Sequence, residues 1–329
     1  MTHFAEIESV LTTPIAYVIF NRPRHTRETF EVIRAQRPSH LLIIADGPRA
    51  GHPTDAERCQ ETRTIVENID WPCEVQRNYA EQNMGCKARV SSGLDWVFEQ
   101  VERAIVLEDD CLPNADFFSY CEALLERYAT DERVWVVTGN NFQRGKKRGD
   151  AAYYFSKYNH CWGWATWRRA WQHYRVDMPY WPAWKETKDW QIKTPDAIER
   201  KVWEGLLDRV KANEIDTWDY QWTACVWYHG GLTATPNVNL VTNIGFGPDA
   251  THTVTSGDEA GLEAYPLGPL AHPAAIRQNY AADKFVFNHN FGGANHPDRL
   301  VNRAKWRLDQ IRRAPTWLMK TVKNLVKSI

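Results

Sequence analysis

Three consecutive acidic residues, Glu108-Asp109-Asp110, follow directly after the apolar run AIVL at residues 104–107. Adjacent carboxylates at the end of a buried strand repel one another, and a bound cation relieves that repulsion. Mg²⁺ and Mn²⁺ prefer oxygen ligands, and they commonly bind one or two protein carboxylates together with substrate phosphates. A solvated acidic turn in front of a helix is the alternative interpretation. Because the tripeptide closes a buried strand, the context favours a divalent metal site that binds a nucleoside diphosphate.

Polar side chains also follow two other apolar runs. Residues 15–20 (IAYVIF) precede Arg22, and residues 41–45 (LLIIA) precede Asp46. Arg22 could contact a phosphate or a base, or it could simply cover the surface. Asp46 could accept a hydrogen bond from the N3–H group of uracil, or it could belong to an ordinary Asp-Gly turn.

The second half of the chain offers a candidate base and a further metal ligand. Asp219 lies in the sequence TWDYQW at the start of a predicted helix, where a carboxylate could deprotonate an acceptor hydroxyl. Its alternative role is an acidic residue that the helix dipole favours at that end, and Asp216 competes with it as the base. His252, in the polar stretch GPDATHT, could supply a further metal ligand from a loop that closes over the diphosphate.

These residues need a scaffold, and the first half of the chain alternates between strand and helix patterns. Strands are predicted at residues 15–20, 41–45, 74–77, 104–107 and 134–137, and helices at residues 24–36, 54–68, 86–101 and 114–128. Thr54 and Asn114 are the predicted N-caps of two of these helices. The alternation predicts an α/β fold with a mostly parallel central sheet, in which ligands bind beyond the carboxyl ends of the strands.

The second half is less regular. Helices are predicted at residues 197–211 and 217–228 and a strand at residues 231–237, and two amphipathic helices broken at Pro315 are predicted in residues 299–329. We therefore expect a donor-binding half at residues 1–140, an acceptor-binding and catalytic half at 141–298, and a C-terminal helical segment. Eleven of the sixteen Trp residues lie between residues 162 and 227. Most of them are expected in the core, and two or three could line a sugar groove.

Composition narrows the choice of partners and compartment. The formal net charge is −1, which gives no global signal for binding nucleic acid. The seven Cys residues form neither a CxxC pair nor a zinc-binding spacing, so free thiols in a reducing compartment are expected. The first residues show no signal-peptide pattern, and no apolar run is long enough to span a membrane. A cytoplasmic protein is expected, with peripheral attachment to the inner face of the cell membrane as a second option.

The C-terminal segment motivates that second option. Residues 300–329 contain eight Lys and Arg residues against a single Asp, with Trp306 and Trp317 among the apolar residues between them. A basic amphipathic helix that contains Trp is typical of proteins that bind a membrane surface. The alternative is a helix that docks on the catalytic domain and leaves a solvated basic face.

The chain resembles N-acetylglucosaminyltransferase I and bacterial relatives from polysaccharide loci, some of which carry the label hemolytic protein. The stretches that carry the resemblance cover roughly three quarters of the chain: VIFNRPRHT, IIADGP, GCKARVSSGLDWVF, IVLEDDCLPNADFFSY, CWGWATWRRAW, WDYQW and VNLVTNIGFGPDATHT. The resemblance implies the Rossmann-like GT-A fold of nucleotide-diphospho-sugar transferases and a dependence on Mn²⁺ or Mg²⁺. It also implies that Asp110 is the direct metal ligand and that Glu108 and Asp109 contact the ribose and sugar of the donor.

The resemblance implies roles for other residues as well. They are Arg22 and Asp46 for the nucleotide, Lys87 or Arg89 for the donor region, and Asp219 for the base. The sequence WDYQW has one residue more and one Asp fewer than the Trp-Asp-Asp-Trp segment of the family. The function implied is transfer of a sugar, from UDP-GlcNAc or a related UDP-sugar, to a glycan or lipid-linked acceptor in surface polysaccharide synthesis, with inversion at the anomeric carbon.

Three other functions compete with this one. A retaining transferase or a nucleotidyltransferase would use the same fold, but nucleotidyltransferases usually have a glycine-rich loop after the first strand, where this chain has NRPRHT. The third is a non-catalytic protein that binds sugars or acts on membranes. Such a protein has no need for clustered acids at strand ends, so the acidic tripeptide favours an enzyme.

Overall fold

The computed structural model describes residues 11–246 and 261–299, together with residues 301 and 304. His252 and nearly all of the predicted C-terminal helical segment therefore lie outside the described residues. Within the described residues, no helix is long and apolar enough to cross a membrane.

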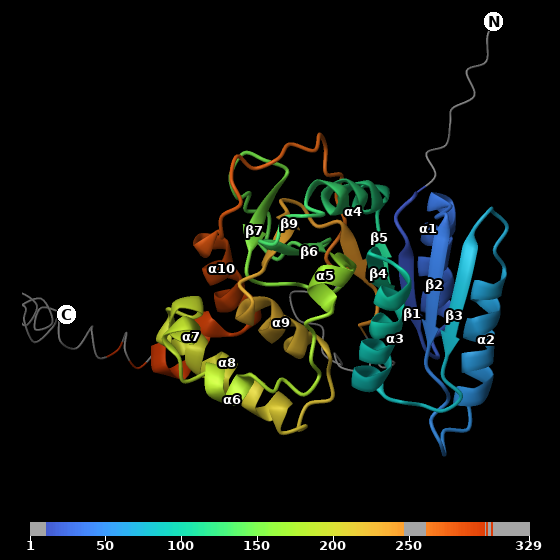
Figure 1. Cartoon of the computed structure of the whole chain (residues 1–329), viewed down its shortest axis with the longest axis horizontal. Coiled ribbons are helices and arrows are strands. Elements are labelled where there is room, and N and C mark those ends of the chain that lie inside the picture. The colour runs from blue at the N-terminus through green and yellow to red at the C-terminus, as the bar shows by residue number, and fades with distance from the viewer. Residues whose placement is uncertain (1–10, 247–260, 300, 302–303, 305–329) are drawn as a thin grey trace, which may run out of the picture.

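An eight-stranded sheet forms the centre of the molecule, in the order β3-β2-β1-β4-β8-β6-β9-β7 (Figure 1). In that order the strands are Glu74–Tyr79, His40–Ala45, Ile15–Ile19, Arg103–Glu108, Trp164–Trp167, Val134–Thr138, Leu232–Pro236 and Tyr153–Ser156. Neighbouring strands run parallel except in the three pairs that involve β7 or β8. The prediction of an α/β fold with a mostly parallel, Rossmann-like sheet is confirmed.

Helices cover both faces of this sheet. One face packs against α1 (Pro23–Gln36), α2 (Asp55–Glu67) and α4 (Ala115–Arg127). The other packs against α3 (Cys86–Gln100) and against a group of elements from the second half of the chain. That group consists of α5 (Arg168–Trp171), α6 (Trp181–Trp184), α7 (Lys188–Lys193), α8 (Ala197–Lys211), α9 (Asp219–Tyr228) and α10 (Tyr280–Asn290). Because both faces are covered, the inner strands β1, β2, β4 and β6 are buried over most of their length.

A two-stranded antiparallel sheet lies beside the carboxyl end of β4. It pairs β5 (Cys111–Pro113), directly after the acidic tripeptide, with β10 (Val241–Asn243), from far along the chain. The pairing brings residues 241–246 alongside the end of β4. This contact, rather than anything near it in the sequence, completes the surroundings of the acidic residues.

The tryptophan cluster forms most of the core on the α3 face. Ten of the eleven Trp residues between residues 162 and 227 are buried, and Trp162 is the partly exposed one. Their rings contact one another closely, as in the pairs Trp164–Trp218 and Trp203–Trp227 with centroids 5.6 and 4.7 Å apart. The expectation that most of them belong to the core is confirmed. All seven Cys residues are free thiols, as expected.

The predicted halves share one continuous sheet. Strand β8 comes from the half at residues 141–298, but it lies between β4 and β6, which belong to the half at residues 1–140. The assignment of donor binding to one half and acceptor binding to the other stays a prediction.

Both predicted N-cap residues stand at the N-cap position, but only Asn114 caps its helix with its side chain. The side chain of Asn114 accepts a hydrogen bond from the backbone N–H of Phe117 at the start of α4. Thr54 makes no such bond at the start of α2. There, the next residue, Asp55, is buried and accepts hydrogen bonds from Asn21 and Arg49, so the loops after β1 and β2 are fastened to this helix end instead.

Candidate active site

Arg22 and the acidic tripeptide meet at the carboxyl ends of β1 and β4, which are parallel neighbours with Val18 opposite Glu108. Arg22 donates to Asp110 from Nη1 to Oδ2 at 2.9 Å, and its Nη2 and Nε donate to the two oxygens of Asp109. One guanidinium therefore contacts two adjacent carboxylates, a geometry for which its planar set of donors is suited.

Burial disfavours the charged forms of the carboxyl groups in this cluster. Asp109 is only 2% exposed, and burial raises the pKa of its carboxyl, against the lowering effect of Arg22. Burial, with the nearby charges of Asp110 and Asp109, also raises the pKa of Glu108. For Arg22 burial alone would lower the pKa, but the two carboxylates outweigh it and raise the pKa, so the guanidinium stays charged. The cluster holds one cation against three acids, and a second cation would relieve the remaining repulsion.

The backbone of residues 244–245 lies against Asp110. The Ile244 N–H donates to the Asp110 carbonyl at 2.8 Å, and Nε2 of His25 lies 3.1 Å from the Ile244 carbonyl oxygen. A Cβ atom on Gly245 would lie 2.1 Å from Oδ2 of Asp110. Only glycine leaves room for the carboxylate at this point. Sequence reasoning missed Gly245 and His25, although the glycine in NIGFGP was a signal for a close backbone approach.

Substitution of Gly245 by Ala is therefore expected to displace Asp110 and to lower the free energy of unfolding by about 1–3 kcal/mol through overpacking. Gly205→Ala is the matched control, because a Cβ on that glycine of α8 meets nothing within 4 Å. The control should be neutral or slightly stabilising, since alanine favours a helix. Urea unfolding of both variants measures the difference, and equal stabilities would show that the contact at Asp110 is not tight.

Asp46 and Arg89 are held in structural roles. The Asp46 carboxylate accepts from the N–H groups of Gly47 and Met84 on one oxygen and from Gly85 N–H and Asn83 Nδ2 on the other. Four donors fill the accepting capacity of a carboxylate. The predicted hydrogen bond from Asp46 to a nucleotide base is therefore not available in this arrangement.

The guanidinium of Arg89 makes contacts within the protein as well. It is buried, and it donates to the backbone carbonyls of Ala45 and Asn78 at 3.2 and 2.6 Å and to Ser92 Oγ at 3.4 Å. Arg89 thus fastens α3 to the ends of β2 and β3, and its contact with the donor stays a prediction. Lys87 remains closer to the surface, where its Nζ donates to Asn213 Oδ1 at 3.0 Å and lies 3.9 Å from Asp216.

Asp219 lies at the first position of α9, and Thr217 Oγ1 donates to its carboxylate. Its charge contributes to raising the pKa of Glu108, after burial and the two neighbouring Asp residues. Burial followed by Asp219 and Glu108 likewise raises the pKa of Cys161. The structure therefore places Asp219 within electrostatic reach of the tripeptide, although 109 residues separate Asp219 from Asp110 in the chain.

A cavity of about 240 Å³ opens beside Asp219. Its wall includes the aromatic side chains of Trp162, Trp203 and Phe291 and the amide of Asn159. Trp162 also contacts Phe246, with ring centroids 5.6 Å apart, at the end of the segment that covers Asp110. Two or three Trp residues were expected to line a groove, and the wall contains the partly exposed Trp162 and the buried Trp203.

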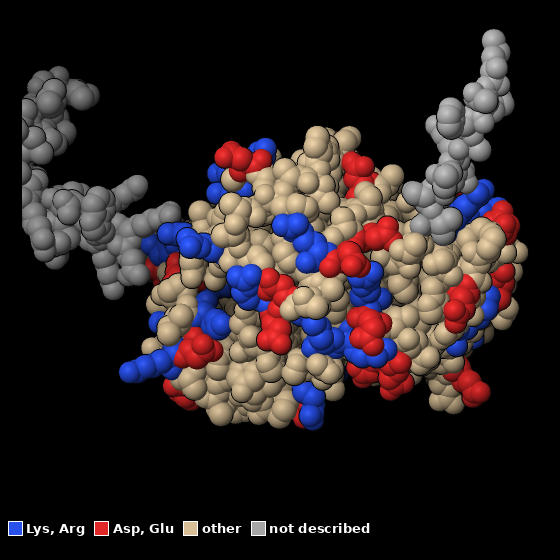
Figure 2. Space-filling model, turned by 45° about the horizontal axis from the view of Figure 1, so that its top comes forward, with Lys and Arg blue, Asp and Glu red and all other residues tan. Residues whose placement is uncertain are grey.

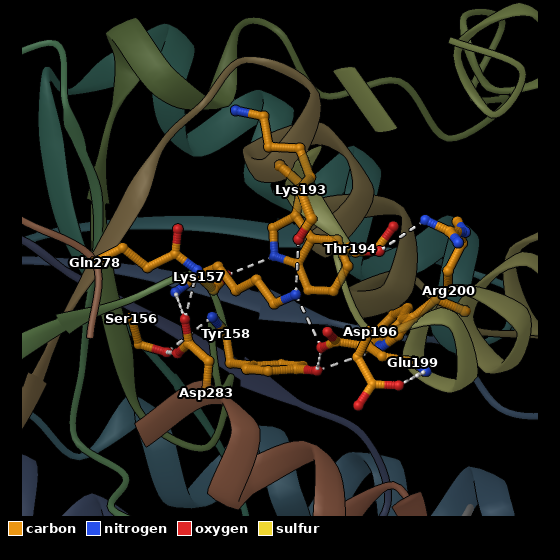
Figure 3. A network of polar contacts seen from close by, with 12 residues as sticks. Ser156, Lys157, Tyr158, Lys193, Thr194, Asp196, Glu199, Arg200, Gln278 and Asp283 are labelled. Atoms are coloured by element: carbon orange, nitrogen blue, oxygen red, sulfur yellow. Dashed lines mark hydrogen bonds and ion pairs between the residues drawn. The ribbon is translucent and has the colours of Figure 1, made fainter. Parts of the chain in front are cut away.

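A buried polar network supports this wall from behind (Figure 3). Lys157 Nζ pairs with Glu199 Oε1 at 2.8 Å and donates to the Lys193 carbonyl at 2.9 Å. The hydroxyl of Tyr158, a residue of the cavity wall, donates to the same carboxylate. The network thus joins the end of β7 to α7 and α8, and it fixes the ring of Tyr158.

Asp283 of α10 belongs to this network and gives it a pH dependence. Burial raises the pKa of its carboxyl to about 6, against the hydrogen bonds from Ser156 and Gln278. Between about pH 4 and pH 6 the folded protein binds this proton more tightly than the unfolded chain, so the contribution of Asp283 to stability falls as pH rises through that window.

Asp283→Asn is expected to remove about 2–3 kcal/mol of this pH dependence, because the amide never ionises. The amide of Gln278 can rotate to accept from the new Nδ2 group, so the fold should tolerate the change. The measurement is urea unfolding at several pH values for the wild type, for Asp283→Asn and for the exposed control Asp150→Asn. An unaltered slope in the Asp283 variant would show that this carboxyl does not titrate in the window.

Within the described residues, no three His, Cys, Asp or Glu side chains are arranged to hold a metal ion by themselves. Magnesium-type sites, however, commonly use one or two carboxylates and take their other ligands from substrate phosphates and water. Asp110 suits such a site, because its side chain is 16% exposed, whereas Asp109 is nearly fully buried.

Comparison with known proteins gives a distant structural similarity. No family model matches the chain, and no curated protein matches it. Matching solved structures number 127 chains. One is the 4-diphosphocytidyl-2C-methyl-D-erythritol synthase from Anaerococcus prevotii DSM 20548, with 10% identity, coverage of 54% of this chain and 78% of that chain, and a TM-score of 0.29. A similarity this weak supports no inference about function, so the function has to be argued from the site itself.

Proposed function

We propose that this protein is a metal-dependent glycosyltransferase that moves a sugar from a nucleoside diphosphate donor to a hydroxyl of a glycan or lipid-linked acceptor. The observation that carries the proposal is the pairing of Arg22, at the end of β1, with two carboxylates at the end of β4, within electrostatic reach of a separate carboxylate, Asp219, beside an aromatic cavity. A purely structural ion pair would not need the cavity, and a binding protein would not need three acids around one arginine.

Asp110 and the phosphates of the donor would hold the metal, Mn²⁺ or Mg²⁺. When bound, the metal neutralises the diphosphate and makes it a better leaving group. Arg22 fixes Asp109 and Asp110 in place and offsets part of their charge. His252 as a further ligand stays a prediction, as do contacts of Glu108 and Asp109 with the ribose and sugar.

Asp219 would serve as the general base. In this scheme the acceptor oxygen attacks the anomeric carbon, and its proton passes to the Asp219 carboxylate. The bond between the anomeric carbon and the phosphate oxygen breaks, and the nucleoside diphosphate leaves with the bonding electron pair. Attack from the face opposite the leaving group inverts the anomeric configuration.

Nucleic acid is not expected as a partner. Acidic and basic side chains are interspersed over the face shown in Figure 2, and the net charge is −1. A nucleic-acid-binding surface would instead concentrate basic residues. Attachment to the inner face of the cell membrane through residues 299–329 stays a prediction.

Nucleotide binding tests the proposal most directly. With Mn²⁺ present, UDP or another nucleoside diphosphate near 100 times its Kd should stabilise the protein by about 2.7 kcal/mol, a shift of roughly 5 °C in Tm. Asp110→Asn should abolish the shift, and the exposed control Asp150→Asn should keep it. A screen of donor hydrolysis across UDP-, GDP- and TDP-sugars would then identify the donor. A protein that responds to no nucleoside diphosphate, with either metal, would not be a transferase of this kind.

A further inference from the structure

The cavity beside Asp219 contains an amide that makes no side-chain hydrogen bond within the described part of the chain. Asn159 lines the cavity and is 94% buried, yet neither its Oδ1 nor its Nδ2 makes a hydrogen bond with a described residue. Leaving both ends of a buried amide unpaired is costly. A bound molecule that offers one donor and one acceptor would satisfy both.

The walls of the cavity indicate what that molecule is. The partly exposed Trp162 and Phe291 present aromatic surface, the buried Trp203 lies behind them, and Asp219 and Asn159 supply the polar groups. Aromatic walls with a few converging polar groups are typical of sites for small organic ligands. A volume of about 240 Å³ falls below the range of about 300–1,000 Å³ for drug-sized ligands, so the cavity suits a single ring.

The charges on the wall exclude acidic ligands. No Lys or Arg lines the cavity. Burial lowers the pKa of His160, another wall residue, to about 3, so its imidazole is neutral at physiological pH. Asp219 is therefore the formal charge in the wall, and the Lys157 ammonium behind Tyr158 is already paired with Glu199. An anionic ligand would meet repulsion from Asp219, with no cation in the wall to offset it.

We propose that this cavity binds the acceptor's terminal sugar as a neutral pyranose ring, with Asn159 contacting two hydroxyls and the aromatic side chains packed against the ring. Uronic acids and other acidic sugars are excluded. This specificity rests on the proposed function, because Asp219 is the base that faces the acceptor. Asn159 is thus a specificity-determining residue.

The test uses the full-length protein with free sugars and without nucleotide or metal. Saturation-transfer NMR and Trp fluorescence would compare neutral methyl hexopyranosides with the matching methyl uronosides. At least one neutral sugar should bind, at least about tenfold more tightly than its uronoside. Equal or tighter binding of the uronosides, or no binding of any neutral glycoside at tens of millimolar, would overturn the proposal.

Two variants sharpen the result. Asn159→Ala should weaken binding of the neutral sugar about tenfold, through the loss of two hydrogen bonds. It should leave Tm unchanged or raised, because a costly buried group is removed, whereas a structural role would lower Tm. Asn68→Ala, at an exposed residue at the end of α2, is the control with unchanged binding.

Tyr220→Arg adds a cation to the wall and should shift the preference toward the uronoside. An unchanged preference there would contradict the electrostatic argument.

Failure of this inference and failure of the proposed function give different results. If Mn²⁺-dependent UDP binding is intact but neutral glycosides do not bind, the assignment of the cavity falls and the transferase stands. If neutral glycosides bind but no nucleoside diphosphate does, the cavity binds sugar in a protein that is not a transferase.

Discussion

Asp219→Asn is expected to lower kcat by about 10²–10⁴-fold, because an amide cannot accept the proton of the attacking hydroxyl. The KM for the donor should change by less than about threefold, since the loss is confined to the transition state. The substitution keeps the size of the side chain and its acceptor for Thr217, so α9 should form as before. The measurement is steady-state release of the nucleoside diphosphate, with the donor identified by the hydrolysis screen.

Asp216→Asn separates the two candidate bases. Asp216 lies three residues before Asp219, its side chain is 61% exposed, and its carboxylate lies 3.9 Å from Lys87 Nζ. Its replacement should leave kcat within about threefold of the wild type, since an exposed carboxylate outside the cavity does not gain enough from orientation to act as the base. A larger loss for Asp216→Asn than for Asp219→Asn would transfer the role to Asp216.

Arg22→Met is expected to lower the free energy of unfolding by about 3–5 kcal/mol, the usual cost of removing one partner from a buried ion pair. The Met side chain would fill similar space, but Asp109 and Asp110 would be left with no cation. The matched control is Arg24→Met, two residues further along in α1, where the Arg side chain is 85% exposed and pairs with Glu28. Its loss should cost less than about 1 kcal/mol.

Divalent metal gives this variant a second readout. If the carboxylates can bind Mn²⁺, the ion should restore part of the stability of Arg22→Met and should raise its Tm more than that of the wild type. Urea unfolding with and without Mn²⁺ measures the effect. A loss below about 1 kcal/mol, or an equal response of both proteins to the ion, would show that the cluster needs no second cation.

The sheet edge could be predicted from the sequence because its signals are local. The apolar runs predicted the strands of the first half. The polar residues that follow them were therefore expected at one edge of the sheet, where the structure pairs Arg22 with Asp109 and Asp110. The roles of Asp46 and Arg89 could not be read in this way. Both lie at strand or helix ends where ligands often bind, but their partners are backbone groups of the 83–85 turn and of the ends of β2 and β3. Residue type does not reveal such contacts.

The elements that the sequence did not predict depend on long-range pairing. Strand β8 reads WATW, without alternating polarity, and it is a strand because it fits between β4 and β6. Strand β10 is three residues long and pairs with β5, which begins 130 residues earlier. Asn159 gave no signal either, since an unpaired buried amide can be recognised only once its neighbours are known.

The pairing of β10 with β5 has a consequence for how the protein is made. The tripeptide is synthesised early, whereas Gly245, which lies against Asp110, is synthesised more than a hundred residues later. A nascent chain that ends before Val241 therefore presents its acidic residues without their final neighbours. Any binding activity of the tripeptide should arise only near the end of synthesis, and ribosome-bound chains of increasing length should acquire it in a single late step.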